Sequence, residues 1–258
     1  MPTYEQWLKS FEMVINAPNP RRAKTPLMMC EIGWPGSGLG AAPTVEVFEK
    51  ILGALVKLRH SRCYGRVDAE AGMIRKIWWV VSDLVNFDRP PDQSGELFPL
   101  EAAPVPEADR KRNLAIMRLA AEYAAEALVD RPPRETQTHR RVNEALELLG
   151  ELTCREELRG LIERVVVKAR KMIAGVEDDT TSAAIEFLQS YYCRHDVEIS
   201  EEFLNELRDL EARIQRETVL FQINSLLIAV GEIDELTAMS SVDLFRDCRE
   251  DLMGDSDL

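Results

Sequence analysis

The residues best suited to chemistry in this chain are three histidines and five cysteines, and they are widely scattered. His60 stands three residues before Cys63, and Cys193 stands two residues before His195. Both pairs fall near the end of a predicted helix, so four ligands could close a tetrahedral zinc site if the two ends met. Zinc motifs usually contain a tighter Cys-x-x-Cys pair, which this sequence lacks. We therefore expect free thiols and no metal site.

Catalytic motifs are also missing from the sequence. No histidine or serine lies in a G-x-S-x-G or H-E-x-x-H pattern. The acidic pairs Asp178-Asp179 and Glu201-Glu202 fall at predicted helix starts, where carboxylates stabilise the positive helix end. We assign no catalytic residue. A helical enzyme whose polar residues converge only in three dimensions stays open as an alternative.

A Gly/Pro-rich segment, residues 33–43, precedes a predicted helix, which is where a phosphate-binding loop would lie. A P-loop ends in Gly-Lys followed by Ser or Thr, but Gly40 is followed here by Ala-Ala-Pro. The dinucleotide pattern G-x-G-x-x-G is also unmet, because Gly38 and Gly40 are only two residues apart. We expect a loop that exposes Trp34, and no cofactor.

Proline divides the chain into two parts with different helix content. All 13 prolines lie at or before Pro133. Because proline breaks helix interiors, the residues after it can be nearly continuous helix, whereas the first part must be interrupted. The sequence predicts an all-α fold of antiparallel helix pairs, stacked as an α-solenoid or as an irregular helical bundle.

Apolar periodicity and capping residues place the expected helices. Thr3 and Thr44 are predicted N-caps, Thr153-Cys-Arg-Glu156 fits a capping box, and Ser200 caps a later helix. Residues 27–32 form either a short helical turn or a strand. The predicted helices cover residues 3–16, 44–61, 68–86, 107–130, 138–152, the stretch from the Thr153 cap to 174, 182–194 and 240–253. Between 201 and 230 the sequence predicts either one long helix or two helices joined by a bend near 216–218.

These elements suggest three regions along the chain. Residues 1–86 form an N-terminal helical region that includes the 33–43 loop. Residues 87–106 contain five prolines and little periodicity, which is typical of a linker or surface loop. Residues 107–258 form a C-terminal helical-repeat region that is acidic from residue 175 onward.

A ten-residue apolar pattern starting at Asn143 recurs from Ser182 and from Asn224, at a spacing of about 40 residues. The copies from Asn143 and Asn224 also share Asn at the start and Gly-Glu near the end. On these residues, the segment 137–253 resembles HEAT or armadillo-type helical repeats, with 44–86 as a further candidate. The resemblance implies a stacked solenoid that grips a partner protein without catalysis.

The negative charge of the chain gathers near its C-terminus. Residues 175–258 hold 21 acidic and 6 basic side chains, against a net charge of −13 for the whole chain. A surface of this kind repels nucleic-acid phosphates and anionic lipid and attracts basic proteins, although a solvated surface is the plain alternative. Scattered cysteines, a polar N-terminus and the lack of a long apolar run predict a cytoplasmic protein without a membrane segment.

The sequence therefore favours a non-catalytic interaction scaffold, adaptor or regulatory subunit that binds a basic protein partner through its acidic C-terminal helices. The candidate partner-binding residues are Glu232, Asp234, Glu235, Asp243 and Asp247. We do not expect direct binding of nucleic acid. Besides the helical enzyme, an acidic nucleic-acid mimic or inhibitor is a third hypothesis.

Overall fold

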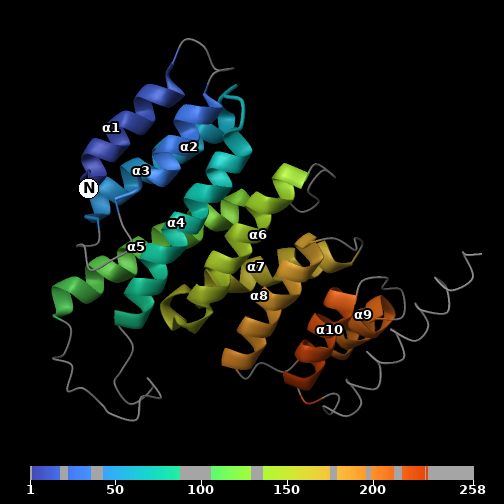
Figure 1. The fold of residues 1–258 in the computed structure, drawn as a ribbon. Helices are drawn as coiled ribbons and strands as arrows, with labels where there is room; N and C mark the ends of the chain where they lie inside the picture. The colour runs from blue at the N-terminus through green and yellow to red at the C-terminus, as the bar shows by residue number, and fades with distance from the viewer. Residues whose placement is uncertain are drawn as a thin grey trace, which may run out of the picture. The chain divides into compact units, whose positions relative to one another are not determined.

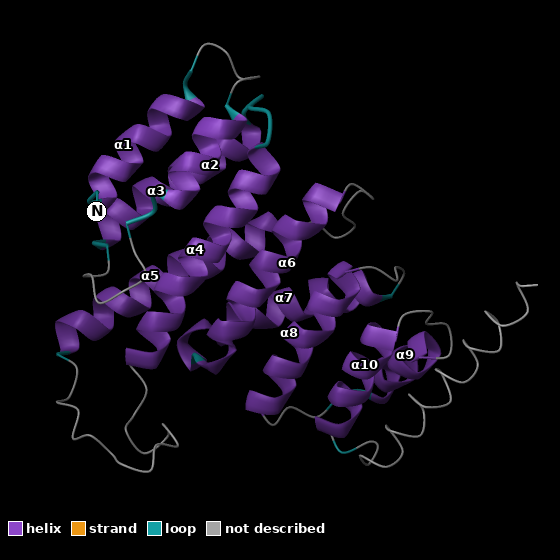
Figure 2. Ribbon diagram, in the orientation of Figure 1, coloured by secondary structure: helices purple, strands orange, loops and turns teal. Residues whose placement is uncertain are grey.

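The computed structural model describes residues 2–17, 23–35, 43–87, 106–128, 136–174, 179–195, 199–211, 217–229 and 231. Every regular element within these ranges is helical, and no strand is found among them (Figure 2). This confirms the predicted all-α class. The helical repeat and the finer choice between a solenoid and an irregular bundle stay predictions. None of the described helices is long and apolar enough to cross a membrane.

The chain divides into two compact units, residues 1–161 and 162–258, coloured blue to lime and yellow to red in Figure 1. Within the described residues, unit 1 contains α1 (Tyr4–Ile15), α2 (Lys24–Ile32), α3 (Val45–His60), α4 (Arg66–Phe87), α5 (Glu107–Ala127) and α6 (Thr136–Glu151). Unit 2 contains α7 (Arg159–Ile173), which begins just before the boundary, α8 (Asp179–His195), α9 (Glu201–Glu211) and α10 (Glu217–Ala229).

Helix α4 is the centre of unit 1, because it packs against α2, α3, α5 and α6. Four successive residues, 71–74, are all buried, so this stretch is covered on every side rather than along one stripe. Helix α1 packs on α3 and α2. Helices from both sides of the proline-rich segment 87–106 thus share one core, since α5 and α6 pack on α4.

The apolar positions that the repeat pattern marks lie in the cores of the two units. In α6 and α8 every such position is buried, and in unit 2 α8 and α10 pack against each other. These buried residues are Ala145, Leu146, Leu148, Leu149, Leu152, Ala184, Ile185, Phe187, Leu188, Tyr191, Leu226 and Leu227. The pattern therefore identifies core-facing residues correctly.

Three of the predicted N-caps form as expected. Thr3 and Gln6 make a reciprocal capping box at the start of α1. The Thr44 hydroxyl accepts the Val47 amide at 3.3 Å, and the Ser200 hydroxyl accepts the Phe203 amide at 3.4 Å. The ambiguous stretch 27–32 is helical and belongs to α2.

The capping box predicted at Thr153–Glu156 is wrong. Two 3₁₀ turns, Leu152–Cys154 and Glu156–Leu158, occupy this stretch, and α7 begins only at Arg159. The reason is that Thr153 is buried and its hydroxyl donates to the Gly150 carbonyl at 2.8 Å. The side chain therefore completes the end of α6 instead of capping the next helix.

Candidate functional site

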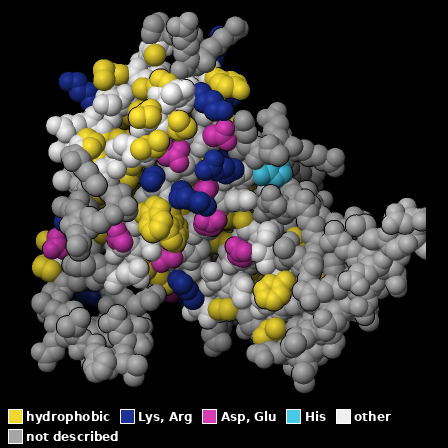
Figure 3. Space-filling model, viewed as in Figure 1, with side chains coloured by type: hydrophobic (Ala, Val, Ile, Leu, Met, Phe, Trp, Pro, Cys, Tyr) yellow, Lys and Arg dark blue, Asp and Glu magenta, His cyan; other side chains and the backbone are white. Residues whose placement is uncertain are grey.

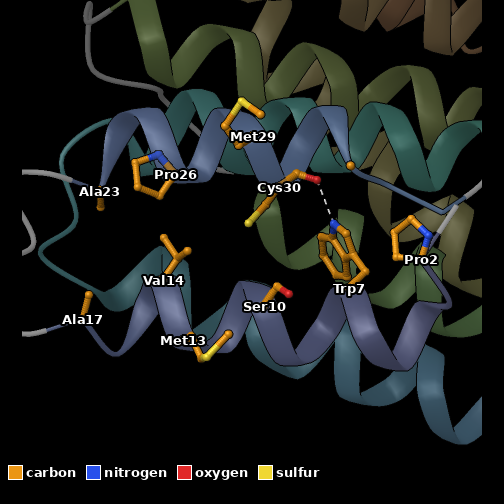
Figure 4. Close-up of a pocket in the computed structure, with 11 residues that line it drawn as sticks. Pro2, Trp7, Ser10, Met13, Val14, Ala17, Ala23, Pro26, Met29 and Cys30 are labelled. Atoms are coloured by element: carbon orange, nitrogen blue, oxygen red, sulfur yellow. Dashed lines mark hydrogen bonds between the residues drawn. The ribbon is translucent and has the colours of Figure 1, made fainter.

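Helices α1 and α2 run antiparallel and leave a groove between them of about 650 Å³ (Figure 4). Its α1 wall presents Ser10, Met13 and Val14, and its α2 wall presents Pro26, Met29 and Cys30. Ala17 and Ala23 line one end, and Pro2 and Gly33 line the other. The groove thus follows most of the length of both helices, about three helical turns.

An aromatic cluster holds the two walls together. Trp7 of α1 donates its indole N–H to the Cys30 carbonyl of α2 at 2.7 Å, in a buried hydrogen bond drawn in Figure 4. The Trp7 ring stacks on Phe11 at 4.9 Å, and the Trp34 ring meets Trp7 edge-on at 4.8 Å. These contacts join α1 to α2 on the inner side of the groove.

Exposed apolar side chains gather on the same two helices. Met13, Met28, Met29 and Ile32 are 63%, 50%, 56% and 67% exposed. Figure 3 shows hydrophobic side chains collecting over α1 and α2 on this face of unit 1. Methionine is flexible and polarisable, and it is common on surfaces that bind apolar helices of varied sequence. Exposed apolar side chains that gather in one region of a surface typically mark an interaction site.

The described residues that line the groove carry almost no polar side-chain groups. The Ser10 hydroxyl already donates to the Gln6 carbonyl at 3.1 Å. Burial raises the pKa of the Cys30 thiol, so this cysteine is not an activated nucleophile. As far as the structure describes the lining, it therefore provides no acid–base pair for catalysis. They provide apolar contact area.

A buried charge cluster joins four helices of unit 1. Glu70 of α4 is at its centre, with a side chain only 1% exposed. Its Oε1 accepts hydrogen bonds from Arg59 Nε of α3 at 2.7 Å and from the Tyr123 hydroxyl of α5 at 2.8 Å. Its Oε2 accepts from Arg141 Nη1 of α6 at 3.4 Å. The Arg59 guanidinium also lies over the Tyr123 ring, 4.8 Å from its centre.

The pKa shifts in this cluster follow from burial and from the Glu70 charge. Burial, and then the nearby Glu70 carboxylate, raise the pKa of Tyr123 well above its ordinary value. Burial opposes the charge of Arg59, but the interactions with Tyr123 and Glu70 outweigh it, and the pKa of Arg59 is raised. Tyr123 is therefore a neutral donor and Arg59 a cation.

A second group of charges links α4 to α6 nearer the surface. Arg75 Nε donates to Glu144 Oε2 at 2.8 Å, and Arg75 Nη2 lies 3.8 Å from Glu147. Burial raises the pKa of Glu144, and Arg75 only partly offsets this. Figure 3 shows acidic and basic side chains alternating over this part of unit 1. The Arg75–Glu147 pair is about half exposed on both sides, and pairs of that kind contribute little stability individually.

The residues predicted to bind a partner, Glu232, Asp234, Glu235, Asp243 and Asp247, lie outside the described residues. So do residues 36–42 of the Gly/Pro-rich loop, residues 88–105 of the proline-rich segment and the predicted helix 240–253. These predictions stay predictions.

The structure describes several of the other candidates. Cys63 is buried, and its thiol lies 3.9 Å from the Ile15 carbonyl. Cys193 is exposed, as is His60. The described residues contain no group of three or more His, Cys, Asp or Glu side chains that could hold a metal ion. Trp34, expected on an exposed loop, is instead 6% exposed because it packs against Trp7, so that expectation is wrong.

The structure also shows the surroundings of two further sequence features, the adjacent tryptophans of α4 and the basic stretch of α7. Of the adjacent tryptophans in α4, Trp79 is the outward-facing one at 45% exposure, and its ring meets Trp78 edge-on at 5.1 Å. In the basic stretch of α7, Arg170 lies over the Phe203 ring and pairs with Glu206 at 3.4 Å. This arginine is used to join two helices of unit 2.

Comparisons of the chain with protein-family models, with curated proteins and with solved structures gave no match.

Proposed function

We propose that this protein is a non-catalytic interaction module that binds an amphipathic helix of a partner protein in the α1–α2 groove. The observation that carries the proposal is the groove itself. It is about three helical turns long, its lining is apolar, and Met13 and Met29 on its two walls are more than half exposed. A helix laid into such a groove contacts it through side chains at positions i, i+3, i+4 and i+7.

The lack of polar groups favours a protein helix over a small metabolite. Small-molecule sites combine apolar walls with a few polar groups that fix the ligand's orientation. Among the described residues that line the groove, the only hydroxyl, on Ser10, is already hydrogen-bonded within its own helix. A helix satisfies its own backbone hydrogen bonds and needs only apolar contacts from the groove.

The matched methionines Met28 and Met29 allow a controlled test. They are neighbours in α2 with similar exposure, 50% and 56%, but only Met29 lines the groove. A photo-reactive methionine analogue placed at either position captures partners from the native host. We expect a partner to be captured from position 29 and much less from position 28.

Affinity measurements with the captured protein then decide the proposal. Burying a methionine contributes about 1.5 to 3 kcal/mol, so Met29→Glu should weaken binding roughly tenfold or more. Met28→Glu adds the same charge to the same helix and should leave the affinity nearly unchanged. Equal effects of the two substitutions, or capture from position 28 alone, would contradict binding in the groove.

The acidic C-terminal surface supports a second contact, with a basic protein surface. Among the described residues, α9 exposes Glu201, Glu202 and Asp209 on the side opposite its buried leucines. Reversing the charges of Glu232, Asp234, Glu235 and Asp243 should weaken binding of a basic partner without loss of helicity. Unchanged binding by that variant would eliminate the acidic surface as a contact.

A further inference from the structure

The buried cluster around Glu70 does not balance in charge. It contains two guanidinium groups, Arg59 and Arg141, and one carboxylate, Glu70. Tyr123 adds a neutral hydroxyl. Counting the described residues, one positive charge is therefore left over in a group whose side chains are 14% (Arg59), 12% (Arg141) and 1% (Glu70) exposed. An uncompensated charge at this depth costs several kcal/mol.

The cluster also has more hydrogen-bond donors than the described acceptors satisfy. Glu70 Oε1 accepts hydrogen bonds from Arg59 and Tyr123, and Glu70 Oε2 accepts one from Arg141. Arg59 Nη2 and Arg141 Nε are buried, and neither has a hydrogen-bond acceptor among the described residues. A buried guanidinium N–H without an acceptor loses its hydration and gains nothing in return. Each arginine thus retains a donor that Glu70 does not satisfy.

We propose that Arg59 and Arg141 bind a small oxyanion. An oxyanion supplies what the cluster lacks, namely one or more negative charges and several acceptor oxygens in a small volume. Guanidinium groups bind oxyanions such as phosphate through charge-assisted hydrogen bonds. Both side chains keep some exposed surface, 14% for Arg59 and 12% for Arg141, although the two unpaired donor atoms are themselves buried. Four helices contribute to the cluster, so the bound anion stabilises the packing of α3, α4, α5 and α6 together.

Inorganic phosphate is the probe for this site. The full chain is titrated with phosphate by isothermal calorimetry, with sodium chloride keeping the ionic strength constant so that general screening does not change. We expect saturable binding, accompanied by a rise in the thermal unfolding temperature, because a ligand that binds only the folded state stabilises it.

Two Arg→Lys variants distinguish phosphate binding at this site from phosphate binding at other arginines. Arg141→Lys keeps the charge but removes the Nε donor and should weaken phosphate binding roughly tenfold, the loss expected for one charge-assisted hydrogen bond. Arg75→Lys makes the same change at a half-exposed arginine that pairs with Glu144, and should leave phosphate affinity unchanged.

Two results would overturn the proposal. One is the absence of saturable phosphate binding by the wild-type chain, a measurement that needs no variant and is decisive even if Arg141→Lys fails to fold. The other is equal loss of affinity in Arg141→Lys and Arg75→Lys, which would show that phosphate interacts with surface charge in general.

Discussion

Replacing Glu70 with glutamine tests whether the buried charge cluster stabilises unit 1. The substitution preserves the shape of the side chain but removes its charge, leaving Arg59 and Arg141 without a counter-ion at 14% and 12% exposure. Removing one partner of a buried ion pair typically costs about 3 to 5 kcal/mol. Total stabilities are about 5 to 15 kcal/mol, so Glu70→Gln should remove a large part of the free energy of unfolding.

Urea denaturation followed by tryptophan fluorescence measures this effect in the correct part of the chain. All four tryptophans, Trp7, Trp34, Trp78 and Trp79, lie in unit 1, so the signal reports on that unit even if the two units unfold separately. We expect the unfolding midpoint of Glu70→Gln to fall far below that of the wild type.

Glu147→Gln is the matched control for this experiment. It makes the same chemical change at a side chain that is 47% exposed and 3.8 Å from Arg75. Exposed pairs of this kind contribute about 0 to 1 kcal/mol. If Glu70→Gln destabilises the protein no more than Glu147→Gln does, the cluster makes no special contribution and the reasoning from burial is refuted.

Three further outcomes follow from the structure. The raised pKa of Tyr123 means that its contribution to stability is complete below about pH 10, the ordinary tyrosine pKa, and is lost as the pH rises above it. Alkaline urea titrations should therefore show a shallower loss of stability in Tyr123→Phe than in the wild type, and parallel curves would argue against this. Gly53 of α3 has no atom within 4 Å of an added Cβ, so Gly53→Ala should stabilise by about 0.5 to 1 kcal/mol in the same assay. Thr44→Ala removes the N-cap of α3 and should cost about 1 kcal/mol, whereas no loss would show that the cap is dispensable.

Capping residues and apolar periodicity predicted the helices well, because both depend on residues that are close together in the chain. Thr3 and Thr44 are followed three residues later by the amide that each one caps, so the interaction can be read along the chain. The apolar periodicity of α6 and α8 similarly identifies residues that are buried. The same reasoning failed at Thr153, where tertiary burial turned the hydroxyl toward the preceding helix.

The candidate sites could not be predicted in the same way. Glu70 meets Arg59 across 11 residues of sequence, Tyr123 across 53 and Arg141 across 71, and no short motif connects them. The available hint was Glu70 itself, an acidic residue between Ala69 and Ala71 in a helix that is otherwise apolar on this side.

The sequence by itself determined the all-α class, most of the helix boundaries and which faces of α6 and α8 are buried, since propensity, capping and periodicity act within a few residues. Only the tertiary structure decided that α1 and α2 leave an apolar groove and that the Glu70 cluster retains unsatisfied arginine donors. Both features depend on which helices become neighbours. That choice is made by packing between residues far apart in the chain, such as Trp7 against Cys30 and Glu70 against Arg141.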